Sequence, residues 1–235
     1  FCYDWQEDSK RLGLSDCKMY NMPVIDQVGS RWRSLRDSAH SGKSSQKAKI
    51  VMVGASSTFT LMHLHSIKSI MPSLIERLNG SFELHLCGSI ALPPDLEDLL
   101  DYEPVQLRGY VDDIEAEFLS CDVLLVPTPI KVAARSRIIM GLSYGCCLVT
   151  TIHEQESTPG LRHRHNALIA MEEAELVGLI EQALSNEQLR REIETNARQT
   201  YEDLFRPEVS VGEMERDMSR IVEDFRHTHR LVERV

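Results

Sequence analysis

The sequence predicts an α/β fold: a Rossmann-like parallel sheet with helices on both faces. Two observations support this prediction. Short apolar runs alternate with helix-patterned segments from residue 49 to residue 185, which is the order of a parallel sheet with crossover helices. The runs are continuously hydrophobic, as strands buried on two faces are.

The first predicted strand covers residues 49–54 and ends at Gly54. Apolar residues then recur at helical spacing from Leu61 to Leu78, which predicts a helix that bends or restarts at Pro72. The loop between strand and helix lacks the GxGxxG fingerprint of dinucleotide-binding proteins. Its hydroxyl groups, Ser56 among them, give only a weak signal for contact with a phosphate or a ribose.

The next two predicted strands, 82–88 and 105–109, are separated by a short helix that ends near Leu100. A helix over 114–120 follows. Asp112 and Asp113 stand at its start, where carboxylates accept hydrogen bonds from unpaired backbone amides. The position therefore favours helix capping over catalysis for both residues.

The middle of the chain, Cys121 to Ala170, reads as a βαβ unit followed by a sixth strand. Strand 123–126 ends at two prolines, a helix ends at Gly145, and strands 147–149 and 166–170 follow. The turn after strand 123–126 lies at the edge where open α/β sheets bind ligands and where helix amides favour an anion.

Basic residues gather in this part of an acidic chain, whose net charge is -10. Between residues 131 and 165 two acidic residues stand against five basic ones, Lys131, Arg135, Arg137, Arg162 and Arg164. For any single residue, ordinary surface charge explains its presence. Their convergence near one strand edge predicts a site for a phosphate-bearing small molecule.

The remaining chain divides into three parts. Residues 1–47 end in a polar, small-residue linker and are expected to be the remnant of a preceding domain, because the chain begins with Phe1 rather than Met. Residues 48–206 form the predicted Rossmann-like domain, which ends in helices from residue 172 onward. Residues 207–235 form a helical tail, with an amphipathic piece from about 209 to 222.

Composition excludes several classes of function. With 36 acidic against 26 basic residues, the chain does not favour nucleic acid as a partner. It has no apolar run of about 20 residues and no signal-peptide pattern, which predicts a soluble, cytoplasmic protein. Six cysteines without a CxxC pair predict buried thiols in a reducing compartment. Three HxH pairs without further ligands at suitable spacing predict no metal site.

An ordered set of segments carries a family resemblance, although no single one of them would suffice. In chain order they are VMVG, LHLCG, VQLRGYVDD, CDVLLVPTP, ARSRIIMGLSYGCCLVTT, GLRHRHNALIA and SNEQLRREIETNARQTYEDLF. The set, over about residues 49 to 205, resembles the carboxyl-terminal, nucleotide-sugar-binding half of the retaining GT-B glycosyltransferases of group one (family 4).

The resemblance implies an enzyme made of two Rossmann-like domains that face each other across a cleft. The nucleotide-sugar would bind the half seen here, and the acceptor, a sugar or a lipid-linked glycan, would bind the amino-terminal half. No metal or other cofactor is implied, and the full-length enzyme could associate peripherally with a membrane. The catalytic residues are not assigned, and this chain alone is expected to be inactive.

The resemblance also assigns roles to individual residues. The family's G-x-R-x-K-x-x-E segment falls on Ala133, Arg135, Arg137 and Met140, which gives the two arginines a role at the diphosphate. The turn Gly109, Tyr110 and Val111 corresponds to the one whose backbone meets the base. The expected nucleotide-sugar site is completed by Gly54 and Ser56 after the first strand and by Gly160 and Leu161 near the sugar and phosphates.

The chain departs from the family pattern at three positions, Lys131, Val132 and Met140. Met140 replaces the carboxylate that usually holds the ribose hydroxyls, which would weaken nucleotide binding by about 2 to 4 kcal/mol. Val132 stands in place of an earlier acid, and Lys131 and Val132 replace frequent glycines. These changes keep open a non-catalytic nucleotide-binding or assembly module with a degenerate donor site. A flavodoxin-like nucleotide-binding domain is a weaker alternative. His163 and His165 are expected to be surface loop residues.

Overall fold

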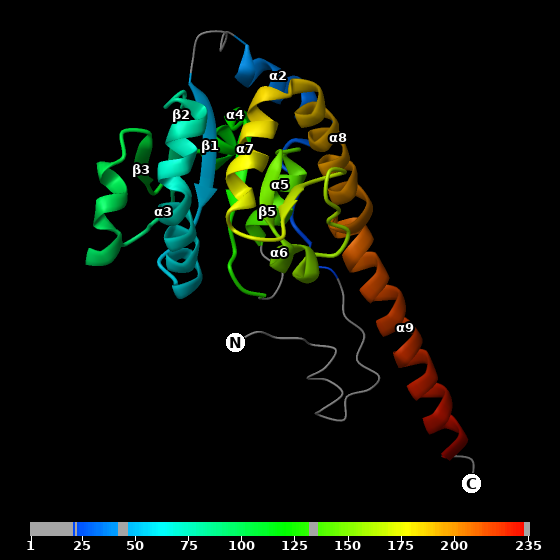
Figure 1. Ribbon diagram of the computed structural model, residues 1–235. Coiled ribbons are helices and arrows are strands. Elements are labelled where there is room, and N and C mark those ends of the chain that lie inside the picture. The colour runs from blue at the N-terminus through cyan, green and yellow to red at the C-terminus, as the bar shows by residue number, and fades with distance from the viewer. Residues whose placement is uncertain (1–20, 22, 42–46, 132–135, 233–235) are drawn as a thin grey trace.

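The computed structural model describes residues 21, 23–41, 47–131 and 136–232. Six strands form one sheet in which all neighbouring strands run parallel, in the order β3-β2-β1-β4-β5-β6 (Figure 1). The predicted fold class is therefore confirmed, and each predicted strand is present with ends shifted by at most two residues. The strands are β1 (Ala48–Val53), β2 (Phe82–Cys87), β3 (Val105–Gly109), β4 (Val123–Val126), β5 (Leu148–Thr151) and β6 (Leu168–Ala170).

Helices cover both faces of the sheet, as expected. One hydrophobic core joins a face of the sheet to α3 (Thr58–Leu78) and α7 (Glu175–Ser185), which cross in front of the strands in Figure 1. A second core joins the other face to three further helices. These are α4 (Ile114–Ser120), α5 (Ser136–Ser143) and α8 (Glu187–Leu204).

Two smaller expectations about helices are decided by the structure. Helix α3 runs through Pro72 without interruption, so the alternative of a restart there is wrong. Met71 and Leu74 on either side of the proline are buried in the same core, which holds the helix together despite one lost hydrogen bond. The Asp113 carboxylate accepts a hydrogen bond from the Ala116 amide at 3.0 Å, which confirms it as the cap of α4. Two short helices lie between strands: a 3₁₀ helix over Pro94–Asp101 between β2 and β3, and α6 (Ile152–Ser157) between β5 and β6.

The described part of the segment before β1 is built into the domain. It contains a 3₁₀ turn over Gly29–Arg31 and helix α2 (Trp32–His40). Arg36 of this helix is 1% exposed and donates hydrogen bonds to the carbonyls of Phe118 and Cys121 and to the Glu194 carboxylate. The domain boundary near residue 47 stays a prediction, because residues 42–46 and 1–20 lie outside the described residues.

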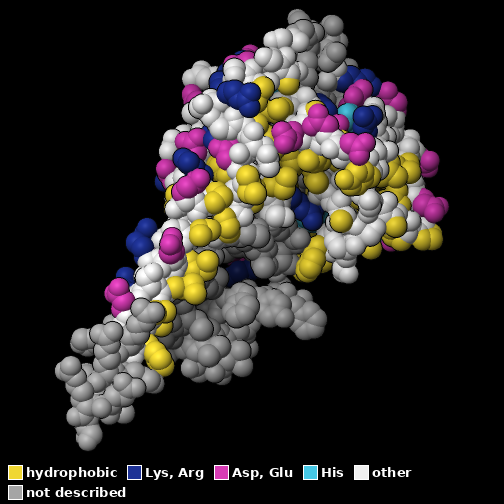
Figure 2. Space-filling model, turned by 180° about the vertical axis from the view of Figure 1, so that it is seen from behind, with side chains coloured by type: hydrophobic (Ala, Val, Ile, Leu, Met, Phe, Trp, Pro, Cys, Tyr) yellow, Lys and Arg dark blue, Asp and Glu magenta, His cyan; other side chains and the backbone are white. Residues whose placement is uncertain are grey.

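The last described element is one long helix, α9 (Pro207–Val232), which extends away from the sheet in Figure 1. The predicted amphipathic piece thus belongs to a longer helix. Its exposed apolar side chains include Met218, Ile221 and Phe225, and Figure 2 shows hydrophobic side chains along it. Among the described residues, no helix has the length and apolarity that a membrane span requires.

Four of the cysteines, Cys87, Cys121, Cys146 and Cys147, are buried and free, as predicted for them. Burial raises the pKa of Cys87 to about 12, so its side chain is a neutral thiol at pH 7. Cys2 and Cys17 lie outside the described residues.

Candidate functional site

The order of the strands fixes where a ligand would bind. From β1 the chain continues to β2 and β3 on one side, and then returns to place β4, β5 and β6 on the other side. The direction of winding therefore changes between β1 and β4. In open α/β sheets, ligands bind at such a point, outside the carboxyl ends of the strands, because the adjacent loops diverge there and leave a crevice.

The loops after β1 and β2 are tied together at this edge. The Ser56 amide and hydroxyl both donate to the Ser89 carbonyl, at 2.8 and 2.9 Å, and the Ser56 hydroxyl accepts from the Ala91 amide at 3.1 Å. Gly88, with φ at +117°, lies so close to the first loop that a Cβ atom would come within 1.7 Å of the Gly54 carbonyl oxygen. Ser56 thus connects the two loops, and its contact with a ligand stays a prediction.

Arg137 lies at the start of α5 and reaches back to the end of β1. Its Nη1 donates to the Val53 carbonyl at 2.7 Å and lies 3.3 Å from Nδ1 of His63. The half-buried guanidinium is therefore beside the loop that begins at Gly54, as the sequence predicted. Arg135, Ala133 and Val132 lie outside the described residues, and Lys131 forms an ion pair with Glu156 at 3.9 Å.

Three buried polar side chains next to Arg137 were not predicted from the sequence. His63 of α3, Thr128 after β4 and Glu154 of α6 are at most 1% exposed. The Thr128 hydroxyl lies 2.9 Å from Nε2 of His63 and donates to the Glu154 carboxylate. The signals that the sequence offered were a histidine on the apolar face of a helix and polar residues two or three positions after two buried strands.

Met140 is half-buried and packs against the core that α5 shares with α4 and α8. It stands one helical turn after Arg137. Its backbone carbonyl accepts from the Ser143 hydroxyl at 2.7 Å. At the position where the family resemblance expects a carboxylate, this chain therefore has an apolar side chain in contact with the core.

The turn after β3 lies at the edge of the sheet and is hydrogen-bonded to the loop after β2. Gly109 has φ at +62° and its carbonyl accepts from the Gly88 amide at 2.7 Å. Tyr110 is 78% exposed, and Val111 packs against the second core. The turn is thus linked to the loop after β2, and its contact with a base stays a prediction.

The turn at Gly160 and Leu161 packs on α8. Leu161 is 3% exposed, and a Cβ atom on Gly160 would lie 2.5 Å from the Leu204 side chain. That this turn and Arg137 line the same nucleotide-sugar site stays a prediction. His163 and His165 are exposed loop residues, as predicted, and Nδ1 of His163 accepts from the Ile169 amide at 2.9 Å.

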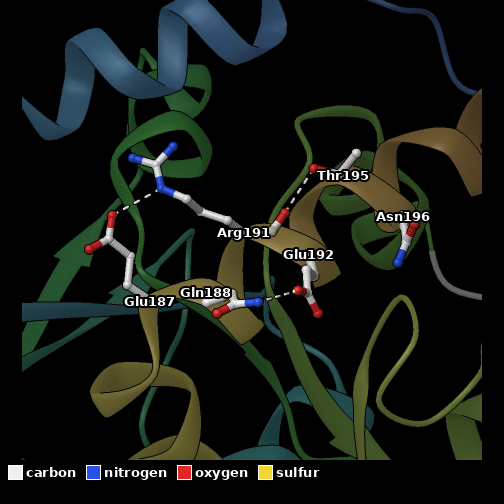
Figure 3. A pocket seen from close by; sticks show the side chains of 6 residues that line it. All are labelled: Glu187, Gln188, Arg191, Glu192, Thr195 and Asn196. Carbon is white, nitrogen blue, oxygen red and sulfur yellow. Dashed lines mark hydrogen bonds and ion pairs between the residues drawn. The ribbon is translucent and has the colours of Figure 1, made fainter.

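Two hollows of the described surface involve α8 instead of the carboxyl edge of the sheet. One of about 640 Å³ is lined by Ala48, the first residue of β1, and by charged side chains of α2 and α8. Another of about 590 Å³ lies over α8 (Figure 3), where Glu187 pairs with Arg191 and Gln188 with Glu192. Because these side chains satisfy one another, the hollow over α8 presents no converging groups for a ligand.

Several solved structures have the same fold. The chain is similar to WaaG, a glycosyltransferase involved in lipopolysaccharide biosynthesis, with 18% identity, a TM-score of 0.62 and coverage of 83% of this chain and 54% of that one. HepE of Anabaena in complex with UDP and glucose has 15% identity and a TM-score of 0.65, with coverage of 91% of this chain and 61% of that one. The sucrose-phosphate synthase of Thermosynechococcus elongatus has 14% identity and a TM-score of 0.69, with coverage of 93% of this chain and 57% of that one.

The chain therefore spans less than two thirds of the length of each of these three structures. Among curated proteins, no sequence matches it. Residues 47–186, which include all six strands and the crevice with Arg137, match the family described as glycosyl transferases group 1. This match covers more than half of the sequence and agrees with the fold, and on these grounds the chain belongs to the glycosyl transferases group 1 family.

Proposed function

We propose that this chain is the donor-binding half of a glycosyltransferase that transfers a sugar from a nucleotide-sugar with retention. The observation that supports this most is the position of Arg137, whose guanidinium lies at the carboxyl edge of the sheet, beside the loop that follows β1. HepE, which shares the fold, has been solved with UDP and with UDP-glucose. A nucleotide-sugar is therefore the class of ligand that we propose for the crevice.

The chemistry of the site suits a diphosphate leaving group. When the bond between sugar and diphosphate breaks, negative charge develops on the leaving phosphate. A guanidinium stabilises that charge through paired hydrogen bonds, and the amides at the start of α5 add a partial positive charge. We therefore propose transfer without a metal ion, in which Arg137 holds the diphosphate.

We further propose that the chain by itself transfers no sugar. Under this proposal, retaining transfer needs a second domain, which holds the acceptor against the donor and excludes water. The acceptor, a sugar or a lipid-linked glycan, would bind that domain. The proposal places the full-length enzyme in the cytoplasm, with peripheral membrane association where the acceptor is lipid-linked.

A second function is favoured by Met140. Its side chain packs against the core where the family resemblance expects the ribose-binding carboxylate. A donor site without that acceptor would bind nucleotides weakly, and the fold would then act as a non-catalytic nucleotide-binding or assembly module. The two functions differ in whether a nucleotide-sugar binds at Arg137.

Calorimetric titration with UDP-, GDP- and ADP-sugars tests the proposal, with Arg137→Ala and Arg77→Ala compared with the unaltered chain. Arg77 pairs with Glu181 on the exposed surface of α3, so its removal changes the net charge equally but leaves the crevice intact. We expect at least one nucleotide-sugar to bind, with about tenfold weaker affinity for Arg137→Ala and unchanged affinity for Arg77→Ala. Equal affinity for all three proteins would contradict the donor site.

A further inference from the structure

A buried chain of hydrogen bonds ends at Arg137 and has no part in the donor site described so far. It runs from Glu154 through Thr128 to His63, and the three side chains are 0%, 1% and 0% exposed. They come from α6, from the segment after β4 and from α3. Burying polar groups is unfavourable unless each finds a partner, so their convergence from three separate elements needs an explanation.

The partners determine the direction of each hydrogen bond. The Glu154 carboxylate accepts from the Thr128 hydroxyl. A hydroxyl has one proton, so the Thr128 oxygen must accept from Nε2 of His63, which lies 2.9 Å away. Nε2 therefore carries the imidazole proton.

The other end of the chain leads to the same conclusion. A guanidinium nitrogen can only donate, and Nη1 of Arg137 lies 3.3 Å from Nδ1 of His63. Nδ1 must therefore be an unprotonated acceptor. Thr128 and Arg137, on opposite sides of the ring, require the same neutral tautomer, with the proton on Nε2.

We propose that Glu154, Thr128 and His63 form a relay that positions Arg137, so that Glu154 determines, through Thr128, how His63 meets the guanidinium. Without the carboxylate as acceptor, the Thr128 hydroxyl could turn and donate to Nε2. The imidazole proton would then move to Nδ1 and face an N–H group of Arg137, and this contact is repulsive. All three are positioning residues rather than catalytic ones.

The relay gives the donor site a preset guanidinium. Nη1 is held by the Val53 carbonyl at 2.7 Å and by His63, so the side chain does not lose further rotamer freedom when a ligand arrives. Preorganisation of this kind improves affinity because the cost of ordering has already been met in the free protein. This effect on affinity rests on the proposed function, in which Arg137 binds a diphosphate. The assignment of the His63 tautomer does not depend on that function.

Two substitutions at Thr128 separate the relay from simple packing. Thr128→Val keeps the shape of the side chain but removes the hydroxyl, whereas Thr128→Ser keeps the hydroxyl. The readouts are the affinity for UDP by calorimetry, the melting temperature, and the ¹⁵N chemical shifts of His63, whose signals are identified by their loss in His63→Gln.

We expect the unaltered chain and Thr128→Ser to show a neutral His63 with the proton on Nε2 at pH 7. In Thr128→Val the Nε2 proton loses its acceptor, so the His63 ¹⁵N signals should shift and UDP should bind about tenfold more weakly, whereas Thr128→Ser should stay within about twofold of the unaltered chain. A loss of melting temperature in Thr128→Val without a loss of affinity would overturn the proposal. A proton on Nδ1 of His63 in the unaltered chain would overturn it as well.

Arg137→Ala distinguishes a failure of the relay from a failure of the proposed function. If Arg137→Ala binds UDP as tightly as the unaltered chain, the donor site at Arg137 is wrong. If it binds weakly but Thr128→Val and Thr128→Ser bind equally, only the relay is wrong. If no variant binds UDP, the ¹⁵N signals still decide: the relay requires the His63 shifts to change in Arg137→Ala, and unchanged shifts would refute it.

Discussion

Restoring a carboxylate at Met140 should strengthen nucleotide binding. The side chain stands one helical turn after Arg137 and is half-buried against the core. Met140→Glu would add an ionised acceptor for the ribose hydroxyls, and a hydrogen bond to a charged group contributes about 1.5 to 3 kcal/mol. The expected gain in affinity is therefore about ten- to a hundredfold.

Met140→Glu should have two further effects, one on folding stability and one on affinity, which can be measured separately. Removing an apolar side chain that is half-buried costs about 1 kcal/mol of folding stability. The new carboxylate also lies at i+3 from Arg137, where a helical ion pair contributes about 0.2 to 0.5 kcal/mol and could draw the guanidinium from the diphosphate. Both effects are smaller than the expected gain, so tighter binding with a lower melting temperature should result.

Calorimetry with UDP and with 2′-deoxy-UDP tests this reasoning. Met140→Glu should bind UDP more tightly than the unaltered chain, and the gain should shrink for the deoxy nucleotide, which lacks one ribose hydroxyl. Met140→Leu serves as the matched control, because it changes the packing without adding an acceptor. Equal gains for both nucleotides, or the same affinity in Met140→Glu and Met140→Leu, would refute the ribose role of this position.

Three further predictions concern stability. Asp26→Asn should lower the free energy of unfolding by about 2 kcal/mol, as read by urea denaturation, because Asp26 pairs through both oxygens with the buried Arg198, at 3.1 and 2.6 Å; an unchanged midpoint would contradict it. Gly88→Ala should destabilise by about 2 to 4 kcal/mol, because the added Cβ meets the preceding loop at 1.7 Å; a normal melting temperature would contradict the close approach. Burial alone would raise the pKa of Glu117, but hydrogen bonds and charge interactions with Lys49 and His85 hold it below the ordinary value of 4.5. The contribution of this carboxylate to folding stability is therefore full above the ordinary pKa and is lost as the pH falls through the folded-state pKa. The melting temperatures of the unaltered chain and Glu117→Gln should therefore converge as the pH falls below the ordinary range of a glutamate, and a constant difference would contradict this.

The sheet could be predicted from the sequence because its central strands are buried on both faces. Residues Val123 to Val126 are all 0% exposed, and such strands appear in the sequence as unbroken apolar runs. The same logic located the crevice, since a strand followed by a loop and a helix fixes the carboxyl edge. Arg137 could be placed there because it stands at the start of the helix that follows β4 in the chain.

The relay next to Arg137 could not be predicted in this way. His63, Thr128 and Glu154 are separated in the chain, and they meet only because α3 and α6 begin, and β4 ends, at the same edge of the sheet. Hydrophobic periodicity indicates which face of a helix is buried, but it does not show which polar residue on that face finds a partner. The uninterrupted helix across Pro72 has a similar origin, since tertiary packing on both sides of the proline outweighs the local preference.

The position of a bound nucleotide tests the central claim most directly. A crystal structure of the chain with its tightest-binding nucleotide-sugar should place the diphosphate at the carboxyl edge between β1 and β4, with a phosphate oxygen within hydrogen-bonding distance of the Arg137 guanidinium. A nucleotide bound instead in the hollow between α2 and α8, with the Arg137 side chain unoccupied, would contradict the account.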